Sequence, residues 1–93
     1  MKVKVKYFMM REITGRRVEE VNIEEGATVQ DLLENLSKKY GDKFKNRLWE
    51  TPGIPRQQIH FLLDGKNIRL LGGLKAKLRE GSTLAIIPPL GGG

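Results

Sequence analysis

The stretch that most constrains the fold lies at the C-terminal end, where an apolar run leads directly into two prolines. Residues 83–87 are β-branched or apolar, which is typical of a buried strand. Pro88 and Pro89 cannot donate hydrogen bonds to a neighbouring strand, so we expect sheet pairing to stop there and the chain to stay extended. The sequence therefore divides into a folded body, residues 1–87, and a tail, residues 88–93.

The tail combines reach with a small cross-section. Its six residues can span about 20 Å when extended, at about 3.3 Å per residue. Leu90 is followed by Gly91, Gly92 and Gly93, which have no side chains and can pass through a narrow channel in another protein. We therefore predict that the working atom is the carboxyl carbon of Gly93. An ordinary frayed chain end, or a remnant of cloning, has the same composition and is the alternative.

The composition fits one small globular domain and excludes several kinds of active site. The 93 residues are 39% hydrophobic and 30% charged, with no cysteine and a single histidine. Such a chain has no thiolate nucleophile, no catalytic triad and no histidine or cysteine cage for a metal. We expect no catalytic residue, no metal and no bound cofactor. No apolar run has membrane-spanning length and the N-terminus does not resemble a signal peptide, so a cytoplasmic protein without membrane contact is expected.

The net charge of +6 is spread over interleaved acidic and basic residues. This pattern favours a solvated surface that steers partners, rather than a nucleic-acid site. A basic surface that binds RNA, DNA or an acidic protein is the alternative interpretation.

The N-terminal third predicts a hairpin followed by a helix. Residues 2–7 alternate strictly, and residues 19–23 form a second strand candidate with Val21 and Ile23 facing inward. We interpret residues 11–17 as a turn or loop. The helix is expected to begin after Thr28 as the N-cap and to end before a glycine. Its apolar stripe falls at helical spacing and comprises Val29, Leu32, Leu33, Leu36 and Tyr40.

The remainder predicts shorter elements. Residues 42–50 are expected to form a second helix, residues 51–55 a loop, and residues 58–63 a third strand in which His60 points outward. Asp64-Gly65 is a strong turn signal into residues 66–68. We expect Leu74 and Leu78 to pack from one short helical turn. Trp49 is interpreted as a lid on the core, with a partner-contacting anchor as the alternative.

This order of elements indicates an α+β fold, with a mixed sheet and one main helix across one face. The first and last strands are expected to be central, parallel neighbours. The tail would then leave from one end of the sheet.

Two segments carry a resemblance to a known family. Tyr7-Phe8 followed by residues 11–15 (Arg-Glu-Ile-Thr-Gly), and residues 81–89 followed by terminal glycines, are similar to motifs of the ubiquitin-like β-grasp sulfur carriers. The chain looks most like the small subunit of molybdopterin synthase and its archaeal relatives, the small modifier proteins. The resemblance implies a β-grasp fold with four to five strands. The segment 41–57 is longer than in the bacterial subunit, which favours the archaeal or ubiquitin-related modifier branch.

The resemblance also implies a function for the tail. An ATP-dependent activating enzyme would adenylate Gly93, and a sulfur donor would convert it to a thiocarboxylate for molybdopterin biosynthesis. Residues 88–92 would thread the partner's channel. The implied partners are the activating enzyme and the large subunit of molybdopterin synthase, or another sulfur-acceptor enzyme. ATP is used by the activating enzyme and is not bound by the carrier.

By the same resemblance, the docking surface is the sheet face near the tail, with Phe8, Ile87 and Leu90 as apolar contacts and Arg11 as a charged contact. The alternative is that Phe8 and Ile87 belong to the core. Two other possibilities stay open. One is a protein modifier that joins Gly93 to target lysines, a sulfur carrier for tRNA thiolation, or both. The other is a non-covalent basic binding module.

Overall fold

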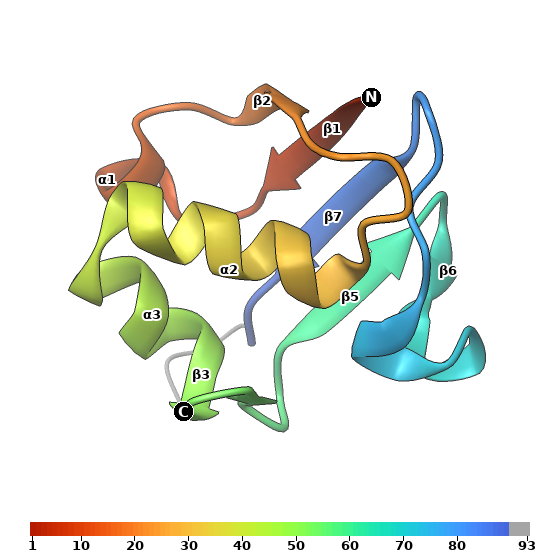
Figure 1. Cartoon of the computed structure of the whole chain (residues 1–93). Helices are drawn as coiled ribbons and strands as arrows, with labels where there is room; N and C mark the ends of the chain where they lie inside the picture. Colours follow the sequence, from red (N-terminus) through yellow and green to blue (C-terminus); the bar gives the residue numbers. More distant parts are fainter. Residues whose placement is uncertain (90–93) are drawn as a thin grey trace.

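The computed structural model describes residues 1–89, which form a mixed sheet of five strands with one long helix across it (Figure 1). The strand order is β2-β1-β7-β5-β6, and the two central strands, β1 and β7, run parallel. The strands are β1 (Lys2–Tyr7), β2 (Val18–Asn22), β5 (His60–Leu63), β6 (Lys66–Asn67) and β7 (Thr83–Ile87). This arrangement confirms the α+β, β-grasp prediction and the parallel pairing of the first and last strands.

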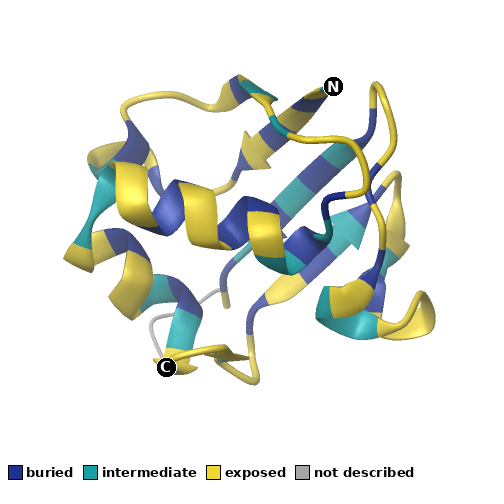
Figure 2. Ribbon diagram, in the orientation of Figure 1, coloured by how far each residue is buried: buried dark blue, intermediate teal, exposed yellow. Residues whose placement is uncertain are grey.

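The main helix, α2 (Val29–Tyr40), begins and ends where the sequence predicts. Thr28 Oγ1 accepts from the Asp31 backbone N–H, and the Asp31 carboxylate accepts from the Thr28 N–H, which forms a capping box. The helix buries its apolar stripe against the sheet (Figure 2). Tyr40, at its last turn, stays half-buried. Each fully buried leucine contributes about 1.5–3 kcal/mol relative to an exposed one.

The sheet contributes alternate residues to the same core. Val3, Val5 and Tyr7 are buried on β1, and Leu84 and Ile86 are buried on β7. The period of two in the sequence therefore identifies the inner face of β1 correctly, because successive strand residues point to opposite faces. None of the helices in residues 1–89 has the length and apolar character to cross a bilayer.

Three local predictions are wrong. Residues 11–17 contain a one-turn helix, α1 (Arg11–Thr14), which ends at Gly15 with φ +73°. Residues 49–50 were expected to end a helix and residues 51–55 to form a loop, but together they contain a small hairpin, β3 (Trp49–Thr51) and β4 (Ile54–Pro55). Both elements are too short to leave a periodic pattern in the sequence.

The third error concerns the crossover between β6 and β7. This crossover holds two short 3₁₀ turns, η1 (Ile68–Leu70) and η2 (Gly73–Lys75). Leu78 lies beyond η2 and donates its N–H to the Ala27 carbonyl at 2.9 Å. Leu78 is buried, but η2 ends at Lys75, so Leu74 and Leu78 do not share a helical turn.

The segment after α2 forms α3 (Asp42–Leu48), with Phe44 and Leu48 fully buried as the spacing predicts. Trp49 follows it and is half-buried against the core. Its Nε1 donates to Ser37 Oγ of α2 at 3.1 Å. These contacts support the interpretation of Trp49 as a lid on the core. His60 is exposed at the start of β5, as predicted, opposite Ile87 of β7.

Candidate carrier tail and docking surface

The tail starts from the middle strand of the five-stranded sheet. β7 is hydrogen-bonded to β1 on one side and to β5 on the other, with Ile87 as its last residue. Pairing stops at Pro88, as predicted from the missing N–H. Pro88 is buried and Pro89 is exposed, so the surface of the body lies between the two prolines. Leu90, Gly91, Gly92 and Gly93 lie outside the described residues, and what was expected of them stays a prediction.

The face of the sheet opposite α2, called the open face below, carries the predicted docking residues. Phe8 follows β1, donates its N–H to the Ile86 carbonyl at 3.3 Å and is 45% exposed. It is therefore not a core residue, in contrast to the alternative interpretation. Ile87 is half-buried on the same face, and Arg11 is exposed in α1. Phe8 and Arg11 line one shallow hollow, and Ile87 lies beside it on β7.

The structure adds apolar residues to this face that the sequence reasoning missed. Val18 pairs with Lys6, which pairs with Ala85, which pairs with Leu62, so these four residues form one row across four strands. Val18 is 46% exposed. The signal was available, because extending the second strand by one residue places Val18 on the face opposite to Val21.

Met9 is the other missed residue. It is 62% exposed and lies next to Phe8, in the hollow that also borders Arg11. Its backbone φ is +58°, a left-handed conformation. Sequence gives no signal for this, because left-handed residues are usually glycine, asparagine or aspartate.

Three lysines lie among the apolar residues of the open face. Lys2, Lys4 and Lys6 alternate along β1 on this face and are all exposed. Together with the net charge of +6, they favour a partner surface that is acidic around an apolar centre. Among the described residues, no group of three or more histidines, aspartates or glutamates lies together in a way that would hold a metal ion.

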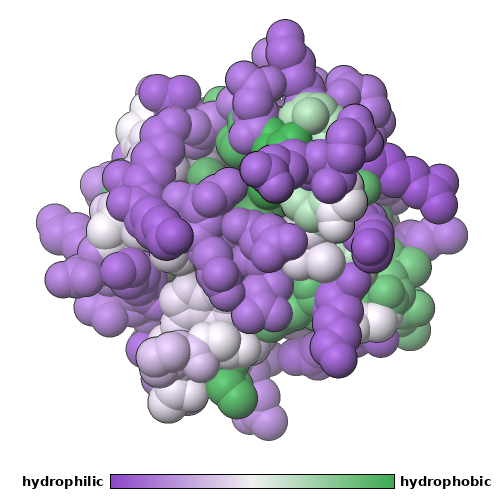
Figure 3. Space-filling view, viewed as in Figure 1, coloured by the Kyte–Doolittle hydropathy of each residue, from purple (hydrophilic) through white to green (hydrophobic). Residues whose placement is uncertain are grey.

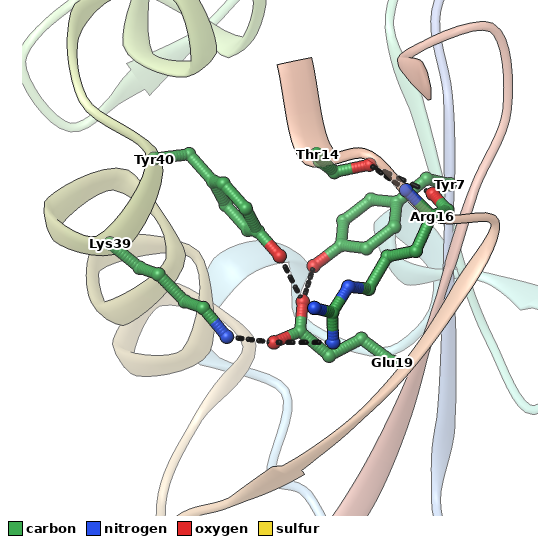
Figure 4. Close-up of polar contacts among 6 residues, drawn as sticks. All are labelled: Tyr7, Thr14, Arg16, Glu19, Lys39 and Tyr40. Carbon is green, nitrogen blue, oxygen red and sulfur yellow. Dashed lines mark hydrogen bonds and ion pairs between the residues drawn. The ribbon is translucent and has the colours of Figure 1, made fainter. Parts of the chain in front are cut away.

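One carboxylate faces the core and forms the polar cluster in Figure 4. Glu19 of β2 has a side chain that is only 4% exposed. It accepts hydrogen bonds from Tyr7 Oη at 2.7 Å and from Tyr40 Oη, and forms an ion pair with Lys39. Arg16 lies further away, with Nη1 4.0 Å from the carboxylate. The alternation that predicts Val21 and Ile23 as inward residues also places Glu19 on the inner face. What the sequence did not indicate is that Tyr7, Tyr40 and Lys39 would be its partners.

The protonation states of this cluster follow from its contacts. Burial alone would raise the pKa of Glu19, but hydrogen bonds from Lys39, Tyr40 and Tyr7 outweigh it and hold the pKa below its ordinary value of 4.5. Burial and the neighbouring carboxylate raise the pKa of Tyr7, and the same two causes raise that of Tyr40. The Glu19 contact raises the pKa of Lys39. The cluster is thus an ionised carboxylate between neutral phenols, and it joins β2, β1 and α2.

Comparisons with known proteins agree with this geometry. The model of the ThiS family matches residues 5–93. Small archaeal modifier protein 3 of Haloferax volcanii is 29% identical over 94 residues, which cover both chains completely. The solution structure of small archaeal modifier protein 1 of Methanosarcina acetivorans has a TM-score of 0.82 at 32% identity, covering 99% of this chain and 96% of that one.

A second similar structure has a name that refers to molybdopterin. The putative molybdopterin converting factor, subunit 1, of Pyrococcus furiosus has a TM-score of 0.76 at 29% identity, covering 97% of this chain and 99% of that one. The resemblance drawn from the two sequence segments is therefore confirmed over the whole fold. The chain belongs to the ThiS family of ubiquitin-like sulfur carrier and modifier proteins.

Proposed function

We propose that this protein is a sulfur carrier whose Gly93 carboxyl group is adenylated by an ATP-dependent activating enzyme and converted to a thiocarboxylate. The proposed use of the sulfur is molybdopterin biosynthesis. The similarity to a putative molybdopterin converting factor subunit supports this choice of pathway. A carrier of this kind supplies no acid, base or metal and acts as a protein-sized group carrier rather than an enzyme.

The observation that supports the proposal most is the position of β7. It is paired on both sides up to Ile86 and with β5 up to Ile87, and the next residue, Pro88, is still buried. A partner that binds the tail therefore binds a chain whose first part, Ile87 and Pro88, is already held by the sheet. Little of the binding free energy is then lost in ordering these two residues.

The proposed chemistry takes place in two steps at the carboxyl carbon of Gly93. A carboxylate oxygen attacks the α-phosphorus of ATP, and pyrophosphate leaves, which forms the acyl-adenylate. A sulfur nucleophile supplied as sulfide then attacks the carbonyl carbon, and the C–O bond to AMP breaks. The product is a thiocarboxylate that carries one sulfur in place of one oxygen.

The proposed partners are the activating enzyme and a sulfur-acceptor enzyme such as the large subunit of molybdopterin synthase. The name of the Pyrococcus furiosus relative describes it as a subunit, which supports a partner of this kind. Both would bind the open face at Phe8 and Ile87, with Arg11 at the edge of the contact. Apolar residues within a charged rim are the usual composition of a specific interface.

Intact-mass measurement tests this proposal directly. The protein is incubated with a candidate activating enzyme from the same cell, ATP and sulfide, and the matched control lacks Gly92 and Gly93. We expect a mass gain that equals the replacement of one oxygen by sulfur, absent from the control. No gain, together with no ATP–pyrophosphate exchange with any such enzyme, would overturn the proposal.

A second candidate function is protein modification, alone or together with sulfur transfer to tRNA. The similarity to proteins named small archaeal modifiers favours it. A lysine amine of a target would attack the same acyl-adenylate and form an isopeptide with Gly93. Higher-mass conjugates that disappear when Gly92 and Gly93 are deleted would support this function, and their absence in cells that contain the activating enzyme would exclude it.

The third candidate is a non-covalent basic binding module. It predicts that the tail is dispensable and that the open-face lysines are not. If deletion of the tail leaves function intact, while charge reversal at Lys2, Lys4 and Lys6 destroys it, this module replaces both carrier functions.

A further inference from the structure

The chain makes a sharp corner between the end of β1 and the start of α1. Met9 lies at this corner with a backbone φ of +58°, a left-handed conformation that residues other than glycine adopt at an energetic cost. The corner turns Phe8 and Met9 outward, 45% and 62% exposed, while Met10 is fully buried. The docking residues Phe8 and Arg11 therefore flank a strained backbone position.

One side chain from a distant element holds this corner. Arg47 of α3 donates from Nη1 to the Met9 carbonyl at 3.1 Å and from Nη2 to Glu12 Oε1 at 2.7 Å. The planar guanidinium fixes the directions of both donors. It therefore sets the Met9 carbonyl and the first turn of α1 relative to α3. We call the two contacts of Arg47, with Met9 and with Glu12, the brace. A groove lined by Glu12, Arg47 and Pro89 places the brace beside the start of the tail.

These contacts lie at the surface. The Arg47 side chain is 36% exposed and that of Glu12 is 61% exposed. Exposed ion pairs contribute little to global stability, so the brace is not needed to hold the core together. Strained backbone in folded proteins gathers at functional sites, where the surrounding structure maintains it. The brace and the strain together identify the corner as a preformed binding element.

We infer that Arg47 is a positioning residue, which keeps Phe8 and Met9 in the conformation that the activating enzyme binds. This inference rests on the proposed function, because the activating enzyme is the partner. It adds Met9 to the docking surface. It also gives a role to the segment 41–57, which contains α3 and whose purpose the sequence leaves open.

The expected size of the effect follows from the population of the bound conformation. Without the brace, Met9 relaxes toward ordinary negative φ values and the docking conformation becomes a minority state. If its population falls to about a tenth, the apparent affinity falls about tenfold. Chemistry at the tail is unchanged once the complex forms, so KM rises and kcat does not.

The chain offers a closely matched control in Arg56. Its Nε donates to the Asn46 carbonyl at 2.7 Å and its Nη1 lies 3.4 Å from Glu50 Oε1. Like Arg47, it joins one backbone carbonyl and one glutamate at the surface and lines the same groove, but neither of its contacts is with the corner. Arg47→Ala and Arg56→Ala therefore remove similar interactions in one region, and only the first removes contacts with the corner.

ATP–pyrophosphate exchange by the activating enzyme is measured against carrier concentration for the full-length protein and both variants. We expect Arg47→Ala to raise KM about tenfold with kcat unchanged, and Arg56→Ala to change neither by more than about twofold. An equal effect of the two variants, or no effect of Arg47→Ala, overturns the inference. Arg47→Lys keeps the positive charge but lacks the two fixed donors of the guanidinium group. A wild-type KM in that variant would therefore also overturn the inference.

A second readout needs no partner. The Phe8 N–H, one residue before Met9, donates to the Ile86 carbonyl of β7, so its hydrogen exchange reports whether the start of the corner is held on the sheet. We expect faster exchange of this amide in Arg47→Ala and wild-type exchange in Arg56→Ala. If the wild-type protein supports no ATP–pyrophosphate exchange, the proposed function fails. The Phe8 amide then still decides whether Arg47 positions the corner, and unchanged exchange rules this role out.

Discussion

The inner and open faces of the sheet carry opposite exceptions to the usual placement of polar and apolar residues. The inner face is apolar and covered by α2, yet it includes Glu19, whose side chain is 4% exposed. The open face is lined by lysines, yet it includes Phe8 and Val18 at 45% and 46% exposure. The helix side that Figure 3 shows is largely hydrophilic, because the apolar residues of α2 face the sheet.

Buried Glu19 and the exposed Phe8 and Val18 differ in whether other residues of the protein compensate for their unusual positions. In the described part of the chain, every buried side-chain nitrogen or oxygen has a hydrogen-bond partner, so the carboxylate on the inner face is fully compensated. Phe8 and Val18, in contrast, leave nearly half of their surface exposed. A satisfied polar residue inside a core stabilises one particular packing, whereas uncovered apolar residues outside fit a binding surface. This difference can be tested face by face.

The largest effect is expected from adjacent residues of β7 that point to opposite faces. Ile86 is fully buried and Ile87 is half-buried. Ile86→Ala should cost about 3 kcal/mol of unfolding free energy, because it leaves a cavity in the core. Ile87→Ala should cost about 1 kcal/mol or less. Urea unfolding followed by circular dichroism measures both, and similar losses for the two variants would contradict the assignment of faces.

The next effect concerns Glu19, which is buried, and Glu20, which is exposed beside it. Glu19→Gln removes the charge that Tyr7, Tyr40 and Lys39 contact, and should cost about 2 kcal/mol. Glu20→Gln should change the unfolding free energy by less than about 0.5 kcal/mol. Equal effects of the two substitutions in chemical unfolding at neutral pH would show that the buried cluster is not stabilising.

The same cluster predicts how stability depends on pH. The pKa of Glu19 is lowered in the folded state, so its contribution is fully present above the unfolded-state value near 4.5. This contribution is lost as the pH falls through the lower folded-state pKa. The difference in unfolding free energy between wild type and Glu19→Gln should therefore shrink below about pH 4.5. A difference that stays constant from neutral pH down to pH 3 would argue against an ionised Glu19 in the folded protein.

The smallest effect on stability is expected at the open face. Val18→Ser should change the unfolding free energy by only about 0.5 kcal/mol, because nearly half of Val18 is already exposed. It should nevertheless weaken binding to the activating enzyme, which calorimetric titration measures. Val21→Ser, on the inner side of the same strand, is the control and should destabilise by about 1 kcal/mol. Unchanged affinity in Val18→Ser would remove Val18 from the docking surface.

Local patterns were sufficient for most of the fold. The alternation in residues 2–7, the apolar stripe and caps of α2 and the Asp64-Gly65 turn predict elements that the structure contains. Asp64 and Gly65 adopt φ values of +50° and +85°, as a tight hairpin turn of this kind requires. These features are readable because each depends on residues only a few positions apart.

The candidate site was predicted less completely. Phe8, Arg11 and Ile87 are found near one another, but Val18 and Met9 were missed, as was the brace from Arg47. Arg47 contacts residues 35 and 38 positions away in the chain. No sequence period links such residues, so the pairing exists only once α3 packs next to α1.

The sequence alone determined that a paired, apolar strand ends at two prolines, and that one amphipathic helix covers an alternating sheet. Those outcomes follow from backbone donors, caps and periodicity, which act over one or two turns. The tertiary structure decided where a buried carboxylate and a left-handed non-glycine residue could be accommodated. Glu19 can face the core because Tyr7 and Tyr40, 12 and 21 positions away, supply donors there. Met9 can keep its left-handed backbone at the open face because Arg47 binds its carbonyl.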